Sequence, residues 1–470
     1  MAIVGKWIGL NVAAFPTTTY TPVPASVFNT QVRNDTNAFN KVDSTITLDT
    51  SNDADGYIIR ASTEIACTHN NRFTGQIKVI PTVNAGNAEV LASVAGQYSR
   101  NTADNDSSSD SFTVITNITG SITFQVQWQR QGTGNPAGSV TNSCLEIIPI
   151  YFNGIGLYEG VTNQLLGGLT PEIAILDSTI TESGNIARSG NDIILSANKK
   201  YLVMGMYYRQ GSTNRTQRWI GFGVNGVMSR DAMTNIYYRD TSNQNQGEAF
   251  NTIIDAGGAD VTLNVFGYIG DGISPPSLGG AGSAGNPPTL TLLSVAVIEL
   301  KGGCETFRSS DNIGDQNIGV VGNVDLNAAR DNIFNDSDSF IKSNDTSYEA
   351  QVNMDAYYGA NIGASYQVAS GTRITRRVLA NVNGVGDVNV NAVKYGRGSQ
   401  GSISTFGFSG NPFGLVSLSE NDLISTGVQD IGGTVDVRTR AGWAGMWGIN
   451  LDTMNNEPPP IVTRRFFSIT

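Results

Sequence analysis

The strongest constraint on the fold of this chain is that its sequence repeats. Residues 215–227 align with residues 373–385, since both read Arg-x-x-Arg, then an alternating strand, then Val-Asn-Gly-Val. Residues 72–86 carry a looser version that ends in Val-Asn-Ala-Gly. A supersecondary pattern that recurs at long intervals is typical of tandem modules. The sequence therefore predicts three copies of one module.

The spacing between two motifs supports this prediction. Apolar strands that contain Tyr57, Tyr201 and Tyr358 precede the three matched segments. The arginine that opens each segment lies 15, 14 and 15 residues after the corresponding tyrosine. Agreement of three separate spacings is expected of copies of one fold.

The second half of each copy is expected to contain a turn and then a strand. The turns are predicted at Asn117–Gly120, Asp255–Gly258 and Asp430–Gly433, because Asn or Asp followed by Gly favours a tight turn. Loops with Gly-Asn-Pro follow in the first two copies, at 132–136 and 282–288, and the third copy is expected to lack this loop. A last apolar strand is predicted in every copy, at 145–151, 290–300 and 443–451.

These signals divide the chain into modules at residues 27–160, 161–302 and 303–452. Residues 1–26 are expected to form an N-terminal docking arm, and residues 453–470 a C-terminal tail. Both flanking segments contain several prolines, and Pro-rich segments stay extended. The chain has 470 residues, which is enough for about three domains of ~150 residues each.

Each copy shows about eight short strand signals with turn residues between them, as two-sheet sandwiches do. Charged residues make up only 15% of the chain, whereas Gly, Asn, Ser and Thr are abundant. The predicted fold class is therefore all-β, with three tandem jelly-roll-like β-sandwich modules and extended terminal arms.

The module resembles a known jelly roll. The stretch from Ile46-Thr47-Leu48 to Gly56-Tyr57-Ile58-Ile59, with the Arg-led strand that ends in Val-Asn-Gly, is similar to the trimeric tumour-necrosis-factor and complement-globular-head superfamily. The third copy departs from it, because Gly359-Ala360-Asn361 follows its tyrosines. The resemblance implies threefold assembly, so a homo-oligomer, and a trimer first, is expected.

The whole chain looks like a structural protein of a tailed bacteriophage, such as a head fibre, a decoration protein or a tail appendage. That resemblance is carried by its Asn/Gly/Thr-rich, acidic composition, few Cys and His, and short arms. It implies location in the virion, with other capsid or tail proteins as partners.

Charge and hydropathy bound the other partners. The net charge of −11 repels phosphate backbones, so nucleic acid is not expected to bind. No stretch reaches the roughly 20 apolar residues of a membrane span, and the N-terminus is a poor signal peptide. No membrane association is predicted.

We expect no enzyme, and no catalytic, cofactor-binding or metal site. His69 is the one histidine and lies in a polar turn without an evident acid or nucleophile nearby. The loop 104–110 offers oxygen ligands that Ca²⁺ would accept, but it lacks the Gly and terminal Glu of a helix-loop-helix site. A solvated loop is the favoured interpretation there, as it is for Asp53 and Asp55.

Other residues leave two interpretations open. Five arginines at matched positions could bind a ligand or glycan, or could form ion pairs on a sheet or at an interface. Four tryptophans in strands could pack in the core or offer a sugar platform. We favour pairing and packing for Arg215, Arg218, Arg373, Arg376 and Arg377, and for Trp128, Trp219, Trp443 and Trp447.

Two further residue types have a plain interpretation. Three widely spaced cysteines are expected to be small buried hydrophobes, with an intermolecular disulfide as the alternative. Three glycosylation acceptor sequences match what chance gives in an Asn- and Thr-rich chain. These residues are Cys67, Cys144 and Cys304, and Asn34, Asn214 and Asn344.

Three functions remain in competition. The first is a non-enzymatic component that decorates or projects from a phage capsid or tail. The second is a receptor-binding fibre or adhesin that recognises a host surface glycan through its loops, since fold does not fix function. The third is a polysaccharide depolymerase, because two carboxylates suffice for glycoside cleavage. The repeat supports the architecture, and the resemblance to phage structural proteins favours the first function.

Overall fold

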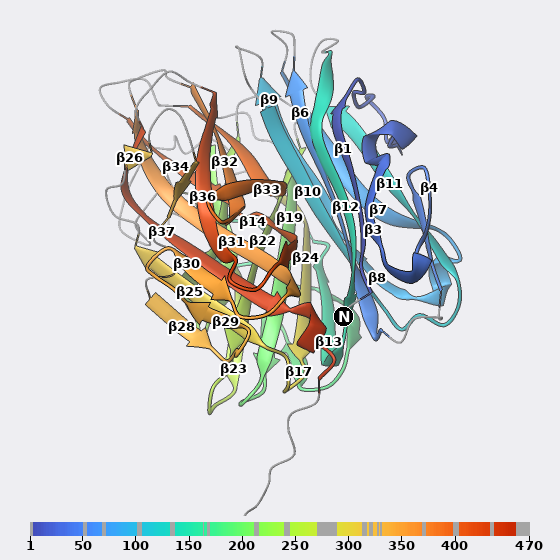
Figure 1. Cartoon of the computed structure of the whole chain (residues 1–470), viewed down its shortest axis with the longest axis vertical. Helices are drawn as coiled ribbons and strands as arrows, with labels where there is room; N and C mark the ends of the chain where they lie inside the picture. The colour runs from blue at the N-terminus through green and yellow to red at the C-terminus, as the bar shows by residue number, and fades with distance from the viewer. Residues whose placement is uncertain are drawn as a thin grey trace, which may run out of the picture.

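The computed structural model describes residues 3–456, apart from 50–53, 68–71, 101–105, 132–136, 163, 167–169, 211–215, 239–244, 270–288, 313–316, 319–322, 327–328, 330, 369–372, 398–403 and 433–436. Figure 1 shows the chain as β-sheets throughout, with the first module in blue to cyan, the second mainly in green and the third in yellow to red. In the described part of the chain, the only helical segments are four short 3-10 turns, and none is long and apolar enough to cross a membrane.

The first module runs from residue 5 to residue 150. It contains β1 (Gly5–Val12), β2 (Thr21–Pro22), η1 (Ala25–Phe28), β3 (Thr30–Asn34), η2 (Asp35–Asn37), β4 (Asn40–Val42), β5 (Thr45–Leu48), β6 (Gly56–Cys67), β7 (Arg72–Val83), η3 (Ala85–Asn87), β8 (Glu89–Ala92), β9 (Val94–Arg100), β10 (Asp106–Thr116), β11 (Ile122–Gln131) and β12 (Gly138–Ile150).

The second module follows after one residue and ends at residue 300. It contains β13 (Phe152–Gly160), β14 (Gln164–Leu165), β15 (Glu172–Ile173), β16 (Ser178–Glu182), β17 (Ile186–Ser189), β18 (Asp192–Leu195), β19 (Lys200–Gln210), β20 (Thr216–Val224), β21 (Val227–Tyr238), β22 (Asn245–Asp255), β23 (Val261–Ile269) and β24 (Thr289–Leu300).

The third module occupies most of the remaining described chain. It contains β25 (Thr306–Asn312), β26 (Asn317–Ile318), β27 (Asn323–Asp325), β28 (Asp331–Asn335), β29 (Phe340–Lys342), β30 (Ser347–Ala350), β31 (Met354–Val368), β32 (Arg373–Val382), β33 (Val385–Arg397), β34 (Ser404–Gly410), β35 (Phe413–Leu418), β36 (Leu423–Gly432), β37 (Val437–Asn450) and η4 (Leu451–Thr453).

Every module is a sandwich of two antiparallel sheets with the same strand order. One sheet runs β1-β12-β6-β10 in the first module, and β13-β24-β19-β22 and β25-β37-β31-β34 in the others. The opposing sheet runs β5-β11-β7-β9, β18-β23-β20-β21 and β30-β36-β32-β33. Because the first strand pairs with the last, each module closes on itself. The prediction of three jelly-roll-like sandwiches is confirmed.

Alternation along the strands explains where each core forms. In β11, the side chains of Ile122, Phe124, Val126 and Trp128 are buried, and the residues between them are partly exposed. Burial of such a side chain stabilises a fold by roughly 1.5–3 kcal/mol. The second and third modules each have a separate internal core of this kind.

The Val-Asn-Gly-Val motif forms the hairpin that its sequence predicts. Asn225 and Gly226 have φ values of 52° and 80°, and Asn383 and Gly384 have 53° and 77°. Two consecutive positive φ angles give the turn whose twist matches the flanking strands, and they favour Asn-Gly. β20 therefore pairs with β21, and β32 with β33, through matched two-residue turns.

The boundaries predicted at the N-terminal side need correction. Most of residues 1–26 are not a free arm, because β1 pairs with β12 and Val4 and Trp7 are buried. β13, which was placed at the end of the first module, pairs with β24 and belongs to the second. The start of the tail is also packed, since Met454 is 1% exposed; residues 457–470 lie outside the described residues.

The turn predicted at Asp430–Gly433 is wrong. Asp430 lies within β36, opposite Arg376 of β32. The equivalent turn is at Ser419–Asp422, where Asn421 has a φ of 69° and the Asp422 carboxylate accepts the Ser419 N–H. The Asp-x-Gly-Gly sequence predicted a turn wrongly, because glycines also occur inside strands. The Gly-Asn-Pro loops at 132–136 and 282–288 lie outside the described residues.

Candidate functional site: the three seams

The three modules form a closed ring within one chain. β9 of the first module contacts β19 and β22 of the second, β21 of the second contacts β31, β34 and β37 of the third, and β33 of the third contacts β10 and β12 of the first. β9, β21 and β33 occupy the same position in their modules. One type of contact, from the edge of a module to the face of the next, is therefore used three times. We call these contacts the first, second and third seams.

The first seam joins consecutive modules through backbone and amide groups. Gly96 of β9 pairs with Gly247 of β22, which merges a sheet of each module into one twelve-stranded sheet. A Cβ on Gly247 would clash with the carbonyl oxygen of Val94. Beside this bridge, Gln97 donates to the Glu248 carboxylate, within a buried contact.

The second seam combines one ion pair with side-chain amides that reach backbone carbonyls. Arg308 of β25 donates to the Asp231 carboxylate at 2.6 and 2.9 Å and to the carbonyl oxygen of Ile253 at 2.8 Å. Asn361 Nδ2 donates to the carbonyl oxygen of Asn251 at 2.7 Å. Every one of these contacts crosses from the third module to the second.

The third seam contains a buried charge network centred on Arg60. The Arg60 side chain is fully buried, and its guanidinium donates to Asp110 at 2.7–3.1 Å and to Glu146 at 3.1 Å. It also donates to the carbonyl oxygen of Asn389 of β33, at 2.9 Å. Arg60 thus links two carboxylates of the first module to the backbone of the third.

Lys6 completes this network. Its ammonium lies 3.1 Å from Glu146 and donates to the carbonyl oxygen of Leu415 at 2.9 Å, while the Leu415 N–H donates to Glu146 at 3.2 Å. Arg377 of the third module pairs with Glu64 of the first on the same seam. The third seam therefore joins two modules that are not consecutive in the chain through charged groups removed from water.

The network shifts the pKa values of its members in opposite directions. Burial disfavours the charged form of Glu146, but Lys6 and Arg60 outweigh it and lower the pKa of Glu146. Burial raises the pKa of Asp110 to about 7, because the attraction of Arg60 only partly offsets desolvation. The two carboxylates on one guanidinium consequently titrate in different pH ranges.

An apolar core fills the space between the three faces. Met204 of the second module accepts a hydrogen bond from the Tyr357 hydroxyl of the third at 4.0 Å. The Tyr357 ring lies edge-on to the rings of Trp447 and Phe413, with centroid distances of 5.5 and 6.5 Å. Phe413 in turn contacts Phe112 of the first module at 6.4 Å. One buried cluster thus includes residues of all three modules.

Several residues that the sequence singled out have structural roles. Trp128, Trp219 and Trp447 are at most 2% exposed, so packing is confirmed for them. Arg377 forms the interface ion pair that was favoured over a ligand-binding row, and Arg376 is fully buried. The side chains of Arg215, Arg218, Arg373 and Trp443 lie outside the described residues.

The acidic candidates divide in the same way. Asp110 belongs to the Arg60 network, and Asp55 accepts the Phe152 N–H at 3.0 Å next to the link between the first two modules. His69, Asp53 and the start of the loop 104–110 lie outside the described residues. In the part that the structure describes, no group of three or more His, Cys, Asp or Glu is arranged to hold a metal ion.

The cysteines and glycosylation sequences carry little chemistry where they are described. Cys144 and Cys304 are buried free thiols. Asn34 donates to the carbonyl oxygen of Phe39, and Asn344 accepts N–H groups of its own turn. Cys67, apart from its backbone, and Asn214 lie outside the description.

Sequence reasoning missed the residues of the third seam, Lys6, Arg60 and Glu146. A signal was present, because Arg60 follows Ile58-Ile59 and Glu146 separates Leu145 from Ile147. A single charge inside an apolar strand is seldom left buried without a partner. The pattern predicts a buried pair but does not reveal which module it faces.

Comparisons with known proteins add only distant likenesses. No family model and no curated protein matches the chain. An atomic structure of Sulfolobus Turreted Icosahedral Virus matches at 12% identity over 86% of this chain and 83% of that one, with a TM-score of 0.16. A structure described as the triple jelly roll fold and turret assembly of an archaeal virus matches at 12% identity, over 86% and 81%, with the same TM-score.

The extracellular domain of ANXUR2 from Arabidopsis thaliana also matches, at 10% identity over 62% of this chain and 96% of that one, again with a TM-score of 0.16. Because the identities and TM-scores are this low, the fold of the chain is assigned from its own strand pairing and not from these matches. The assignment to a tailed phage, the virion location, the partners and the competing glycan-binding function all stay predictions.

Proposed function

We propose that the chain is a non-enzymatic structural component of a phage particle that decorates or projects from its capsid or tail. The observation that carries the proposal is the closed ring of seams. Head-to-tail contacts build a ring when their rotation closes, and here three copies close it inside one chain. The surface buried at the seams holds the three modules together through charged groups, amides and aromatic rings.

The proposal replaces the homotrimer expected from the sequence with a single chain that reproduces a trimer. In a trimer of identical chains, all three seams and all three outer surfaces would be the same. Here Arg60, Met204 and Asn361 occupy the corresponding position of the three modules and differ in charge and size. The three seams of one chain can therefore differ from one another, as those of a trimer of identical chains cannot.

The ring also has two distinct ends. Val4, the links at Tyr151 and 301–305, and Asn456 belong to one end, where Figure 1 marks the N-terminus. The strand ends that flank 68–71, 211–215 and 369–372 lie at the opposite end. We propose that the docking surface for the particle is the end of the ring that carries Val4 and Asn456.

Purified particles test this role directly. Virions from cells that express the chain with a C-terminal tag should contain it at a fixed stoichiometry in mass spectrometry and show it by immunogold labelling. Light scattering of the isolated protein should give the mass of one chain. Absence from purified particles would reject the virion role, whereas a stable mass of three chains would reject only the one-chain trimer.

A further inference from the structure

The link between the second and third modules differs from the link between the first and second. Tyr151 alone separates the first two modules, whereas residues 301–305 connect β24 of the second module to β25 of the third. This longer link contains Gly302 and Gly303, and glycine adopts more backbone conformations than any other residue. A change in the path of the link would move the third module as a unit, while the first two modules stayed together.

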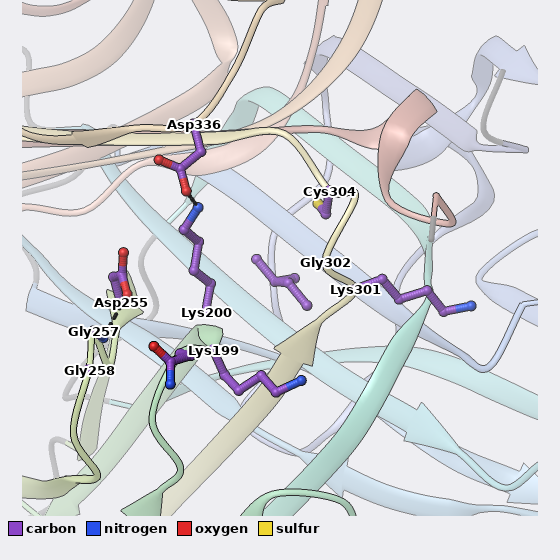
Figure 2. Close-up of a pocket in the computed structure, with 11 residues that line it drawn as sticks. Lys199, Lys200, Asp255, Gly257, Gly258, Lys301, Gly302, Cys304 and Asp336 are labelled. Atoms are coloured by element: carbon purple, nitrogen blue, oxygen red, sulfur yellow. Dashed lines mark hydrogen bonds and ion pairs between the residues drawn. The ribbon is translucent and has the colours of Figure 1, made fainter. Parts of the chain in front are cut away.

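The link is a turn at the surface. It runs along a cleft of about 450 Å³ where the second and third modules meet (Figure 2). Gly302 is exposed, although Cys304 is buried, and the Cys304 N–H donates to the carbonyl oxygen of Lys301 at 3.0 Å. Across the same boundary, Lys200 of the second module pairs with Asp336 of the third. The turn itself therefore contributes little of what holds the two modules together.

The third module has a core of its own and an apolar surface that needs a partner. Its internal core, which includes Ile362 and Val428, contains only residues of this module. Tyr357, Phe413 and Trp447 belong instead to the buried cluster that all three modules share. Outside the ring these aromatic side chains would face water, which is unfavourable. A third module that has left its ring is therefore driven to cover them again.

The polar contacts of the third module specify which surface can cover it. At the second seam its side chains donate to the carbonyl oxygens of alternate residues along β22: Asn411 to Ala249 at 2.9 Å, Asn361 to Asn251 at 2.7 Å and Arg308 to Ile253 at 2.8 Å. At the third seam Arg377 pairs with Glu64. Buried polar groups penalise surfaces that leave them unpaired. The matching surface is offered by the first and second modules of the same chain, or by those of a second copy.

We propose that the third module is exchanged between two copies of this chain. In the exchanged dimer, each ring consists of the first and second modules of one copy and the third module of the other. The two rings stay joined through both copies of residues 301–305. All seam contacts are retained, and the change is confined to the link, so exchange is a low-cost route to a dimer.

The concentration of the chain decides between the two arrangements. The link keeps the third module at an effective concentration in the millimolar range beside its own ring. We therefore expect single chains in dilute solution, and a share of dimers that rises when chains refold together at about 0.1 mM or more. Because this inference concerns the isolated chain, its failure is distinguishable from failure to enter particles.

Charge reversal at the third seam tests the exchange. Arg377→Glu and Glu64→Arg each place like charges at the third seam, which disfavours a ring closed within one chain. When the two variants are refolded together, each third module can meet the oppositely charged first module of the other copy. Light scattering should find at least about tenfold more two-chain species in the mixture than in either variant alone. The chain that carries both substitutions is the matched control and should remain single.

Cleavage of the link shows whether the third module is the part that is exchanged. Unlabelled and isotope-labelled chains, otherwise wild type, receive a protease site between Gly302 and Gly303 and are refolded together at about 0.1 mM. After cleavage of the purified dimer, native mass spectrometry should find single rings that combine a labelled third module with unlabelled first and second modules.

Three results would overturn the proposal. One is the absence of any dimer after refolding at high concentration, and another is a dimer that keeps the mass of two chains after cleavage. The third is a mixture of the charge variants that contains no more two-chain species than each variant alone, although circular dichroism shows both to be folded. If either charge variant does not fold, the cleavage experiment decides alone.

Discussion

The first and third seams use the same geometry but different chemistry. At the first, Gly96 and Gly247 extend one sheet into the next, and Gln97 meets Glu248. At the third, Lys6 and Arg60 pair with Glu146, and Arg60 also pairs with Asp110, beneath the neighbouring module. One seam is mainly backbone and amide, and the other is a buried ionic network.

The connection of the chain explains this difference. The first two modules are linked through Tyr151 alone, so their effective concentration is high and weak contacts suffice to hold them. The third and first modules carry opposite ends of the chain and have no direct link. Buried charges that are satisfied in one arrangement penalise every other arrangement. Our hypothesis is that the network selects the correct closure of the ring.

The largest expected effect comes from Arg60→Ala. This change leaves Asp110 and Glu146 buried without their guanidinium partner, which typically costs about 3–5 kcal/mol. The urea midpoint, followed by tryptophan fluorescence, should fall accordingly. A variant that replaces the network by the residues at the same positions of the second module, Lys6→Leu/Arg60→Met/Asp110→Ala/Glu146→Ala, should recover most of the loss.

The template for that variant is the strand register. Glu146 pairs with Lys6 and Arg60, as Ala296 pairs with Leu157 and Met204. Recovery of the urea midpoint would show that the single substitution acts by leaving charges unpaired. Two results would contradict the hypothesis that the network selects the correct closure of the ring. One is an unchanged urea midpoint in Arg60→Ala, and the other is a fourfold variant less stable than Arg60→Ala.

The titration of Asp110 gives the next largest effect. Folding raises its pKa to about 7 from the ordinary 3.8, so the folded chain holds a proton that the unfolded chain has lost between pH 4 and 7. The free energy of unfolding should therefore fall as the pH rises through that window, by up to roughly 4 kcal/mol. Folding lowers the pKa of Glu146, so its ionised form stabilises the fold at pH values above the ordinary pKa of a glutamate. This stabilisation is lost as the pH falls through the lowered pKa.

Urea unfolding measured from pH 4 to 8 checks this expectation. Asp110→Asn should flatten the slope, whereas the control Asp338→Asn, at an exposed site, should keep it. An unchanged slope in Asp110→Asn would mean that another group binds the proton.

The sequence predicted much of the fold because local signals agreed. The tyrosine strands and the Arg-led strands recur in all copies and lie where predicted, in β6, β19 and β31 and in the strands that follow. The Asn-Gly turns of the second and third copies form the predicted hairpins. The role of residues 5–12 was not predictable from local pattern, because this short apolar strand is placed by its pairing with β12, 128 to 142 positions further along the chain. The same holds for Arg60, whose partner Asn389 is 329 positions distant.

The first seam should respond to Gly247→Ala by a smaller amount. The new Cβ would clash with the Val94 carbonyl oxygen, a backbone atom that cannot move aside without disturbing β9. Overpacking of this kind costs about 1–3 kcal/mol. Hydrogen exchange should show faster exchange in β9 and β22 and no change at Arg60. Uniform loss of protection in all three modules would instead mean that the seams do not open separately.

The smallest effect concerns the hairpin tips, where the modules differ again. Gly226 and Gly384 have φ values of 80° and 77°, so Ala there should cost about 1 kcal/mol each. Gly86 of the first module sits in the looser version of the same turn, has no atom within 4 Å of a new Cβ, and has no left-handed φ. Gly86→Ala should therefore leave the urea midpoint unchanged or raise it slightly. Equal losses in all three variants would mean that the first hairpin shares the conformation of the others.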